Sequence, residues 1–394
     1  MKIIILGHGA IGSVLAKLLQ KEESVKLVVS ADISFKQEKK FEKWHHMNIN
    51  LKNKSELESL LKKYHPDLVI NATSPWFNPD ILQECAKLGI NYMDMAACWE
   101  PDPDKTALSP YKIEQFDFDR QFKEKNILGL IESGVSPGLT NLFVRECADE
   151  FDELEDVKIR LVDYSGTDEF SVAWSKESLL DEIGSKPLVY SDGKFKIVEP
   201  FSGAEDYEFP APYGKQKVCL ICQDEIGTIP FFIKLKNIDI KDYDNQVDIH
   251  KFLYDLGFIS RKKIKLGDIE ISPFEFVNKV LPDISFSNSD PKFNNAQFAF
   301  AVEATGKIKG KKMKIKYFVL FPNQKYINKL GLDANFISYP TALSAKLFAL
   351  AAPKIKAKGI IPPEALEKQV RKFILDGLKK TKHVIIQKRK VKIN

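Results

Sequence analysis

The feature that most constrains this chain is a glycine-spaced turn between a short apolar strand and a helix near its amino terminus. Lys2–Leu6 reads Lys-Ile-Ile-Ile-Leu, too short for a helix and rich in β-branched residues, which predicts a buried strand. Gly7, Gly9 and Gly12 follow in G-x-G-x-x-G spacing, and an amphipathic helix is predicted at Ala10–Leu19. These glycines permit a tight turn, backbone approach to a pyrophosphate and close helix packing, and the helix N-terminus offers N–H groups to phosphates. The pattern predicts a dinucleotide-binding β-α-β unit.

An acidic residue completes this unit. Asp32 follows a second predicted strand, Val25–Val29, and lies 20 residues after Gly12, where a carboxylate can accept hydrogen bonds from ribose hydroxyls. A carboxylate repels the 2′-phosphate of NADP, whereas Lys36 and its neighbouring lysines either contact a phosphate or form a solvated loop. The predicted cofactor is NAD or NADP, with a mild preference for NAD. The predicted cofactor-binding residues are Gly7, Gly9, Ala10, Ile11, Gly12, Asp32, Asn71, Ala72, Thr73 and Gly134.

Strands and helices alternate through the first third of the chain, which predicts a doubly wound parallel sheet of the Rossmann type over residues 1–135. Polar residues at the carboxyl ends of such strands meet the ligand. Further strands are predicted at Met47–Leu51, Leu68–Ala72, Asn91–Met95 and Ile127–Ile131, and helices at Ser55–Tyr64 and Pro79–Leu88.

Residues 136–335 are strand-rich and predict an antiparallel sheet with helices to one side, an α+β substrate and dimerisation domain. The strands are predicted at Val157–Val162, Phe195–Val198, Val218–Ile221, Phe231–Leu235, Phe298–Ala304 and Met313–Leu320, and the helices at Lys176–Ile183 and Val247–Leu256. Residues 336–394 predict helices at Tyr339–Ala352 and from Pro362 through Leu378 that return to the first domain, and Val384–Ile386 fits either a solvated end or a final strand.

Composition excludes several classes of protein. With 394 residues and 44% hydrophobic residues, the chain can bury two substantial cores. The net charge of +5 is spread along it, and neither a signal peptide nor a membrane span is predicted, so no nucleic-acid or membrane partner is expected. Five scattered cysteines make no disulfide framework, and the pair Cys219 and Cys222 is interpreted as buried structural thiols, without a metal. We expect a reduced, cytoplasmic protein.

The second informative segment, Gly134–Asn141, reads Gly-Val-Ser-Pro-Gly-Leu-Thr-Asn and follows the strand at Ile127–Ile131. Its position predicts a loop at the carboxyl edge of the sheet, with Pro137 and Gly138 turning into a helix whose N-terminal amides can bind a carboxylate. An ordinary strand-to-helix turn is the alternative interpretation.

This segment resembles the G-x-D-P-G sequence of saccharopine dehydrogenase-like enzymes, which include saccharopine reductase and carboxynorspermidine dehydrogenase. One position departs from that sequence, because Ser136 stands where the reductases have aspartate. Other segments resemble the family in the same order, namely Leu68–Pro75, Ile90–Ala97, Ala173–Ser175, Pro187–Gly193, Pro200–Pro210, Tyr339–Ala352 and Gly359–Leu366.

The resemblance implies an NAD(P)-dependent, homodimeric oxidoreductase that interconverts an imine and a secondary amine on an amino-acid-derived substrate. Carboxynorspermidine dehydrogenase-like or homospermidine synthase-like activity on a polyamine is one alternative, and a non-catalytic dinucleotide sensor is another. A polyamine site needs several acidic side chains, whereas a dicarboxylate site needs Arg or Lys. The candidate proton donors are Asp94, Cys98, Asp119 and Glu132. The candidate substrate residues are Ser136, Pro137, Gly138, Asn141, Trp174, Ser175 and Lys176.

Overall fold

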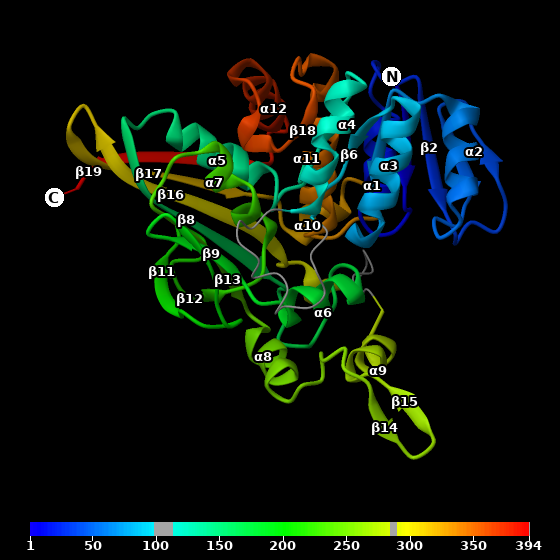
Figure 1. Cartoon of the computed structure of the whole chain (residues 1–394). Coiled ribbons are helices and arrows are strands. Elements are labelled where there is room, and N and C mark those ends of the chain that lie inside the picture. The colour runs from blue at the N-terminus through cyan, green and yellow to red at the C-terminus, as the bar shows by residue number, and fades with distance from the viewer. Residues whose placement is uncertain (98–112, 284–289, 394) are drawn as a thin grey trace.

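The amino-terminal third forms the predicted doubly wound parallel sheet. The computed structural model describes residues 1–97, 113–283 and 290–393. Its first sheet has the order β18-β7-β6-β5-β1-β2-β4-β3, with every neighbouring pair parallel except β3 and β4 (Figure 1). Its strands are β1 Lys2–Leu6, β2 Leu27–Asp32, β3 Lys39–Lys40, β4 Trp44–Asn48, β5 Leu68–Asn71, β6 Asn91–Met93, β7 Leu128–Leu130 and β18 Gly359–Ile361. Its helices include α1 Gly12–Leu19, α2 Lys54–Tyr64, α3 Asn78–Leu88 and α4 Asp119–Glu124.

The second domain contains a nine-stranded sheet of order β10-β9-β13-β8-β16-β17-β19, with β11 paired to β12 and β12 to β13. The prediction of an all-antiparallel sheet is wrong at one pair, because β13 runs parallel to β8. Such a pair needs a long crossover, which residues 165–236 supply. The strands are β8 Glu153–Tyr164, β9 Leu188–Ser191, β10 Lys194–Ile197, β11 Glu205–Glu208, β12 Lys215–Leu220, β13 Asn237–Asp244, β16 Gln297–Ile308, β17 Lys311–Leu320 and β19 Ile385–Lys392.

Two sequence predictions of strands need correction. The strand predicted at Phe231–Leu235 is wrong, because Pro230 lacks an N–H group and begins the short helix α7, Ile229–Phe232. The strand predicted at Met47–Leu51 begins three residues earlier, because Trp44 through Asn48 pair with β2. Aromatic and β-branched residues favour a strand locally, but pairing with a neighbour decides where it starts.

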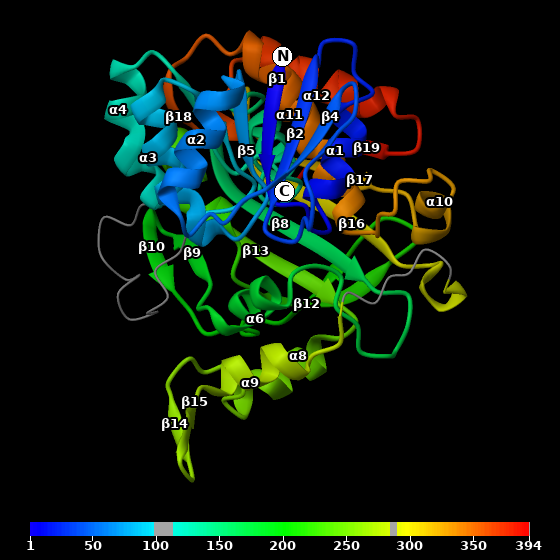
Figure 2. The ribbon, with the colours of Figure 1, turned by 90° about the vertical axis from the view of Figure 1, so that its right-hand side faces the viewer.

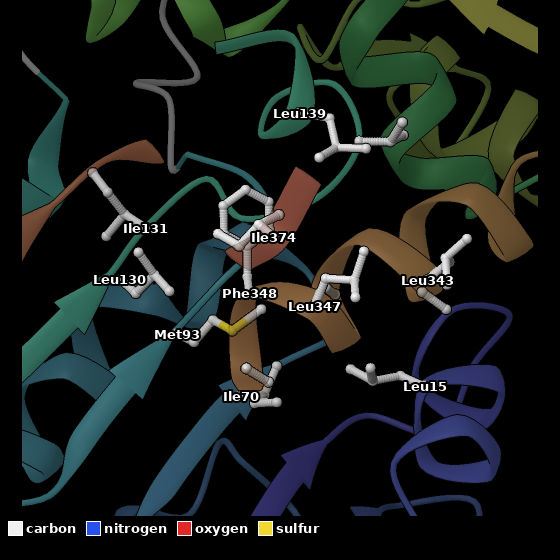
Figure 3. Packing of buried hydrophobic residues seen from close by; sticks show 14 of the residues in the cluster. Leu15, Ile70, Met93, Leu130, Ile131, Leu139, Leu343, Leu347, Phe348 and Ile374 are labelled. Atoms are coloured by element: carbon white, nitrogen blue, oxygen red, sulfur yellow. The ribbon is translucent and has the colours of Figure 1, made fainter. Parts of the chain in front are cut away.

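The carboxyl-terminal helices return to the first domain as predicted. Helix α11, Ser338–Ala351, places Leu347 and Phe348 over the apolar face of the parallel sheet, and Ile374 of helix α12, Lys368–Lys380, lies beside them (Figure 3). Strand β18 then extends the parallel sheet beside β7. The final strand, β19, instead joins β17 of the second sheet, so the carboxyl-terminal segment contacts both domains.

An arm projects from the second domain below both sheets (Figures 1 and 2). It consists of α8 Val247–Asp255, β14 Ile264–Leu266, β15 Ile269–Ile271 and α9 Pro273–Val280. The α-helices not yet named are α5 Leu139–Ala148, α6 Lys176–Gly184 and α10 Gln324–Asn328. Within the described ranges, every helix is too short or too polar to cross a bilayer.

Candidate active site

The glycine turn has the geometry that the sequence predicts. Gly7 has φ of 98°, and a Cβ there would lie 2.6 Å from the carbonyl oxygen of Ala72. A Cβ on Gly12 would lie 2.2 Å from the carbonyl oxygen of Gly7, so helix α1 is packed directly onto the turn. Gly9 faces open space, since its Cβ would meet nothing within 4 Å. The turn is therefore closed on the protein side and open where a pyrophosphate approaches, which fits a dinucleotide.

Asp32 at the end of β2 is held beside this turn. Its carboxylate accepts hydrogen bonds from the backbone N–H groups of His8 and Ser34, each at 2.7 Å. Burial by itself would raise the pKa of Asp32, but the hydrogen bonds from Ser34 and His8 outweigh it and lower the pKa. The carboxylate is therefore ionised and fixed at the position where a ribose is expected.

The loop after β5 closes the other side of the turn. Thr73 lies in this loop, and its Cγ2 would be 2.7 Å from a Cβ added to Gly7. The Asn71 side chain is 3% exposed, accepts hydrogen bonds from the N–H and hydroxyl of Thr73, and donates to Asn78. Asn71 therefore shapes the loop, while Ala10 and Ile11 lie in the turn that enters α1.

The Gly134–Asn141 segment, here called the Pro137 loop, lies at the carboxyl edge of the same sheet. The Ser136 hydroxyl donates to Oε1 of Glu225 at 2.5 Å. Gly138 has φ of 134°, and its N–H donates to the side-chain oxygen of Asn141 at 3.0 Å. The Asn141 amide in turn donates to Glu364 at 3.0 Å. The loop is thus tied to two carboxyl groups that arrive from distant parts of the chain.

The amides that begin α5 are not arranged to bind a substrate carboxylate, which corrects one sequence interpretation. The N–H of Leu139 donates to the carbonyl of Gly134, and the N–H of Thr140 donates to that of Val135, both at 3.2 Å. Asn141 is fully buried, so its side chain positions the loop instead of facing solvent. A backbone N–H that already has an acceptor offers little to an incoming anion.

Four buried acids, here called the inner carboxyl cluster, gather beneath the Pro137 loop. Asp94 follows β6, Glu132 follows β7, Glu225 lies in the short helix η3 Asp224–Gly227, and Glu364 follows β18. Their exposed fractions are at most 1%. Oδ1 of Asp94 accepts the N–H of Glu132 at 2.7 Å, and Oε2 of Glu132 accepts the hydroxyl of Thr228 at 3.0 Å. Adjacent parallel strands therefore deliver Asp94, Glu132 and Glu364 to one edge of the sheet, and Glu225 joins them from the second domain.

Burial shifts the protonation of this cluster. Desolvation raises the pKa values of Asp94, Glu225 and Glu364 to about 7 each. The pKa of Glu132 is raised well above its usual range, by burial first and then by the charges of Asp224, Glu364 and Glu225. One oxygen each of Glu132, Glu225 and Glu364 has no hydrogen-bond partner in the described parts of the chain. The cluster can therefore hold protons near neutral pH, and these oxygens can accept hydrogen bonds from a ligand.

These shifts predict a specific pH dependence of stability. Because the folded carboxyls bind protons more tightly than the unfolded ones, their contribution is complete below about pH 4 and is lost as pH rises through about 7. Each group changes the free energy of unfolding by at most about 1.4 kcal/mol per pH unit. In urea unfolding, the free energy of unfolding should decline as pH rises from 5 to 8. The substitution Glu364→Gln should make this decline less steep. Exposed Glu367→Gln is the matched control, and an unchanged slope in Glu364→Gln contradicts the prediction.

Several predicted site residues lie elsewhere. The proposal of Asp119 as a proton donor needs correction, because Asp119 lies near the amino-terminal ends of β7 and β18. Its carboxylate accepts the N–H of Ile360 at 2.9 Å and pairs with Lys123 at 2.6 Å. Lys176 is paired with Asp283 at 2.7 Å and donates to the carbonyl of Leu281, so it is not free to bind a substrate carboxylate. Cys98 lies outside the described residues.

Trp174 and Ser175 have different positions. Ser175 caps α6, where its hydroxyl oxygen accepts the N–H of Ser178. Trp174 lines a cavity of the second domain together with Glu182 and Asp242. The three neighbouring residues 174–176 therefore have different surroundings, and Trp174 is the one that lines this cavity.

Sequence reasoning named Asp94 and Glu132 as candidate proton donors but missed the other two acids of the cluster, Glu225 and Glu364. Glu225 lies directly after a strand and the buried Cys222, and Glu364 lies in a Pro-Pro-Glu sequence, but neither position carries a recognisable catalytic spacing. The resemblance in residues 359–366 was the only sequence signal near Glu364. Cys219 and Cys222 are buried as expected, and burial raises the pKa of Cys219 to about 12.

A dinucleotide turn and a set of buried proton-holding acids at one sheet edge define an oxidoreductase architecture. Residues 3–130 match the saccharopine dehydrogenase NADP binding domain, and residues 134–383 match the saccharopine dehydrogenase C-terminal domain. The chain belongs to the saccharopine dehydrogenase family of NAD(P)-dependent oxidoreductases, which confirms the resemblance seen in the sequence.

Relatives and solved structures agree with this assignment. The chain is 27% identical over 306 residues to the carboxynorspermidine synthase of Vibrio cholerae, with 72% of this chain and 73% of that protein covered. It is 26% identical to the protein of the same name from Vibrio alginolyticus over 60% of this chain and 58% of that protein, and 23% identical to the carboxyaminopropylagmatine dehydrogenase of Synechocystis over 72% of each. Saccharopine dehydrogenase from Saccharomyces cerevisiae has the same fold, with a TM-score of 0.69, 12% identity and 99% of both chains covered.

Proposed function

We propose that this protein is an NAD(P)-dependent oxidoreductase that interconverts an imine and a secondary amine, and that its amine substrate is polyamine-like. The observation that carries the proposal is the inner carboxyl cluster at the same sheet edge as the glycine turn. Reduction of an imine needs one hydride at carbon and one proton at nitrogen. The bound dinucleotide supplies the hydride, and a buried protonated acid supplies the proton.

Glu132 is our choice for the proton donor. It lies at the end of β7, its Oε2 accepts from Thr228, and its Oε1 has no partner within the described segments. Its raised pKa keeps the proton on the carboxyl group near neutral pH. Asp94 is the alternative donor, with a pKa of about 7 and a direct contact to the Glu132 N–H. The hydrogen-bond donors to these two acids include a backbone amide and a hydroxyl, which orient a carboxyl group without neutralising it.

The charge of the site favours an amine over a dicarboxylate. The side chains that bind Glu225 and Glu364 come from Ser136, Thr140 and Asn141, which are neutral. Within the described ranges, no lysine or arginine forms an ion pair with either acid. With pKa values of about 7, Asp94, Glu225 and Glu364 are partly ionised near neutral pH. A cationic substrate would stabilise their ionised forms, whereas the two carboxylates of a glutamate-derived substrate would oppose that ionisation. Three relatives whose names refer to carboxylated polyamines or agmatine derivatives support the same choice.

The ionised Asp32 supports a mild preference for NAD over NADP, since its carboxylate occupies the position next to the expected ribose. The four described cysteines are buried thiols, which supports the proposed reduced, cytoplasmic setting.

A spectrophotometric screen tests the proposed reaction. NADH and NADPH are each offered with aspartate semialdehyde plus 1,3-diaminopropane, with aspartate semialdehyde plus glutamate, and saccharopine is offered with NAD and NADP. We expect oxidation of the reduced cofactor with the diamine pair and a faster rate with NADH. Cofactor binding without turnover of any pair would support the dinucleotide-sensor alternative and overturn the proposal.

We also propose a homodimer that forms through the arm. Phe252 on α8 and Leu256 directly after it are each 57% exposed, and Leu266 on β14 is 70% exposed. Such exposure is unusual for large apolar side chains gathered on one projection. A second copy of this chain is the occupant that the family resemblance suggests. Sedimentation should give about twice 44.9 kDa, and Phe252→Glu with Leu266→Glu should give a folded monomer. A wild-type monomer at micromolar concentration contradicts the proposal.

A further inference from the structure

A second acidic site lies in the other domain, here called the outer carboxyl pocket. Four acids line one cavity from three elements, and apolar side chains including Trp174 complete its wall. Within the part of the chain that the structure describes, no lysine or arginine lines this cavity. The four acids are Asp163 on β8, Glu182 on α6, and Asp242 and Asp244 on β13.

Two buried atoms of the pocket have no hydrogen-bond partner among the residues that the structure describes. Asp242 is 7% exposed, and its Oδ1 accepts no hydrogen bond from the described residues. His250 is 6% exposed, its Nδ1 lies 2.6 Å from Asp244, and its Nε2 has no partner in the described segments of the chain. An unsatisfied buried carboxylate oxygen is costly, so its presence in a cavity wall indicates that a donor arrives from outside the chain.

The electrostatics indicate a cationic donor. Burial and mutual repulsion raise the pKa of Glu182 to about 8, and they raise the pKa values of Asp163 and Asp242 well above their usual range. A positive charge in the cavity would relieve this repulsion and supply hydrogen-bond donors. Trp174 adds an aromatic side chain to the cavity wall, and alkylammonium groups contact aromatic rings favourably.

The outer pocket is connected to the inner carboxyl cluster. Gln223 donates to Glu182 of the outer pocket at 2.9 Å. Its neighbour Asp224 accepts the N–H of Ala97, close to the end of β6, at 2.8 Å. Asp224 also raises the pKa values of both Glu182 and Glu132 through its charge. The segment 223–225 therefore contacts both sites, because Gln223 binds Glu182 of the outer pocket and Glu225 belongs to the inner carboxyl cluster.

We propose that the outer carboxyl pocket binds a terminal alkylammonium group of the substrate, while the reacting nitrogen lies at the inner cluster. This inference rests on the proposed function and makes it more specific, because the amine must carry two cationic ends. The pocket acts as a specificity site, and Asp242 supplies the open acceptor oxygen. A monoamine can place its nitrogen at the inner cluster but has no second ammonium group for the outer pocket, so it should react poorly.

The test compares 1,3-diaminopropane with n-propylamine as partners of aspartate semialdehyde. We expect kcat/KM of the wild type to favour the diamine by about 100-fold, and Asp242→Asn to reduce that preference at least tenfold with little change for propylamine. Glu182→Gln should act in the same direction. Asp206→Asn is the control, because Asp206 is exposed on β11 and pairs only with Lys215 in the described residues.

The outcomes separate the two proposals. Turnover of propylamine as efficient as that of the diamine, or an unchanged preference in both folded variants, overturns the pocket and leaves the reaction class intact. Absence of turnover with every amine overturns the proposed function. In that case calorimetric titration of the cofactor-loaded protein with 1,3-diaminopropane tests independently whether the outer carboxyl pocket binds the amine. Saturable binding that Asp242→Asn weakens supports the pocket, and no binding in the wild type overturns it.

Discussion

Replacing Glu132 with glutamine should lower kcat by about 100-fold or more, the usual contribution of a general acid. The expectation follows from the position of Glu132 in the inner carboxyl cluster, fully buried and bonded through Oε2 to Thr228. Its raised pKa means that the wild-type carboxyl is protonated near neutral pH. Glutamine has the same shape and no proton to transfer, so the fold and the affinity for NADH should be retained. Steady-state kinetics with the diamine pair and NADH titration by fluorescence measure the two quantities.

The pH profile gives a second readout for Glu132. In the wild type, kcat for imine reduction should fall as pH rises through the raised pKa of this acid, because the proton donor is lost. The residual activity of Glu132→Gln should lack that alkaline limb. Asp94→Asn serves as the comparison, since Asp94 is the alternative donor. A variant Glu132→Gln with activity within threefold of wild type, together with an inactive Asp94→Asn, would transfer the role to Asp94.

Replacing Gly12 with alanine should weaken dinucleotide binding at least tenfold and destabilise the first domain. The added methyl group would lie 2.2 Å from the backbone carbonyl oxygen of Gly7, which is too close for any real contact. Because the neighbour is backbone, either α1 moves off the turn or the turn opens, and overpacking of this kind costs about 1–3 kcal/mol. NADH titration should show at least a tenfold weaker affinity, and urea unfolding should show the lower stability.

Gly9→Ala is the matched control for this effect. A Cβ on Gly9 would meet nothing within 4 Å of the protein, so the stability without cofactor should equal that of the wild type. The same methyl group occupies the space that a pyrophosphate needs, and NADH affinity should still fall. Full NADH affinity in Gly9→Ala would show that the cofactor does not approach this turn, and equal stability of Gly12→Ala and wild type would show that α1 tolerates the shift.

The amino-acid sequence by itself determined the features that depend on local spacing. The glycines at 7, 9 and 12, the apolar strand before them and Asp32 after them identify the nucleotide-binding turn, because each role is set by backbone geometry within about thirty residues. Helices α6 and α8 begin at the predicted residues, Lys176 and Val247, because their apolar periodicity is strong. The family resemblance extended this information to the second domain.

Only the tertiary structure decided which acids form a site. Glu132 and Glu364 are 232 positions apart, yet both lie at carboxyl ends of adjacent parallel strands, because β18 returns to pair with β7. Asp163 and Asp242 meet because β13 runs parallel to β8, a pairing that local alternation cannot specify. Asp119 has the right chemistry for a catalytic acid, but it lies near the amino-terminal ends of the strands. Side-chain chemistry is visible in a sequence, whereas proximity and burial, which shift the pKa values, arise from long-range strand pairing.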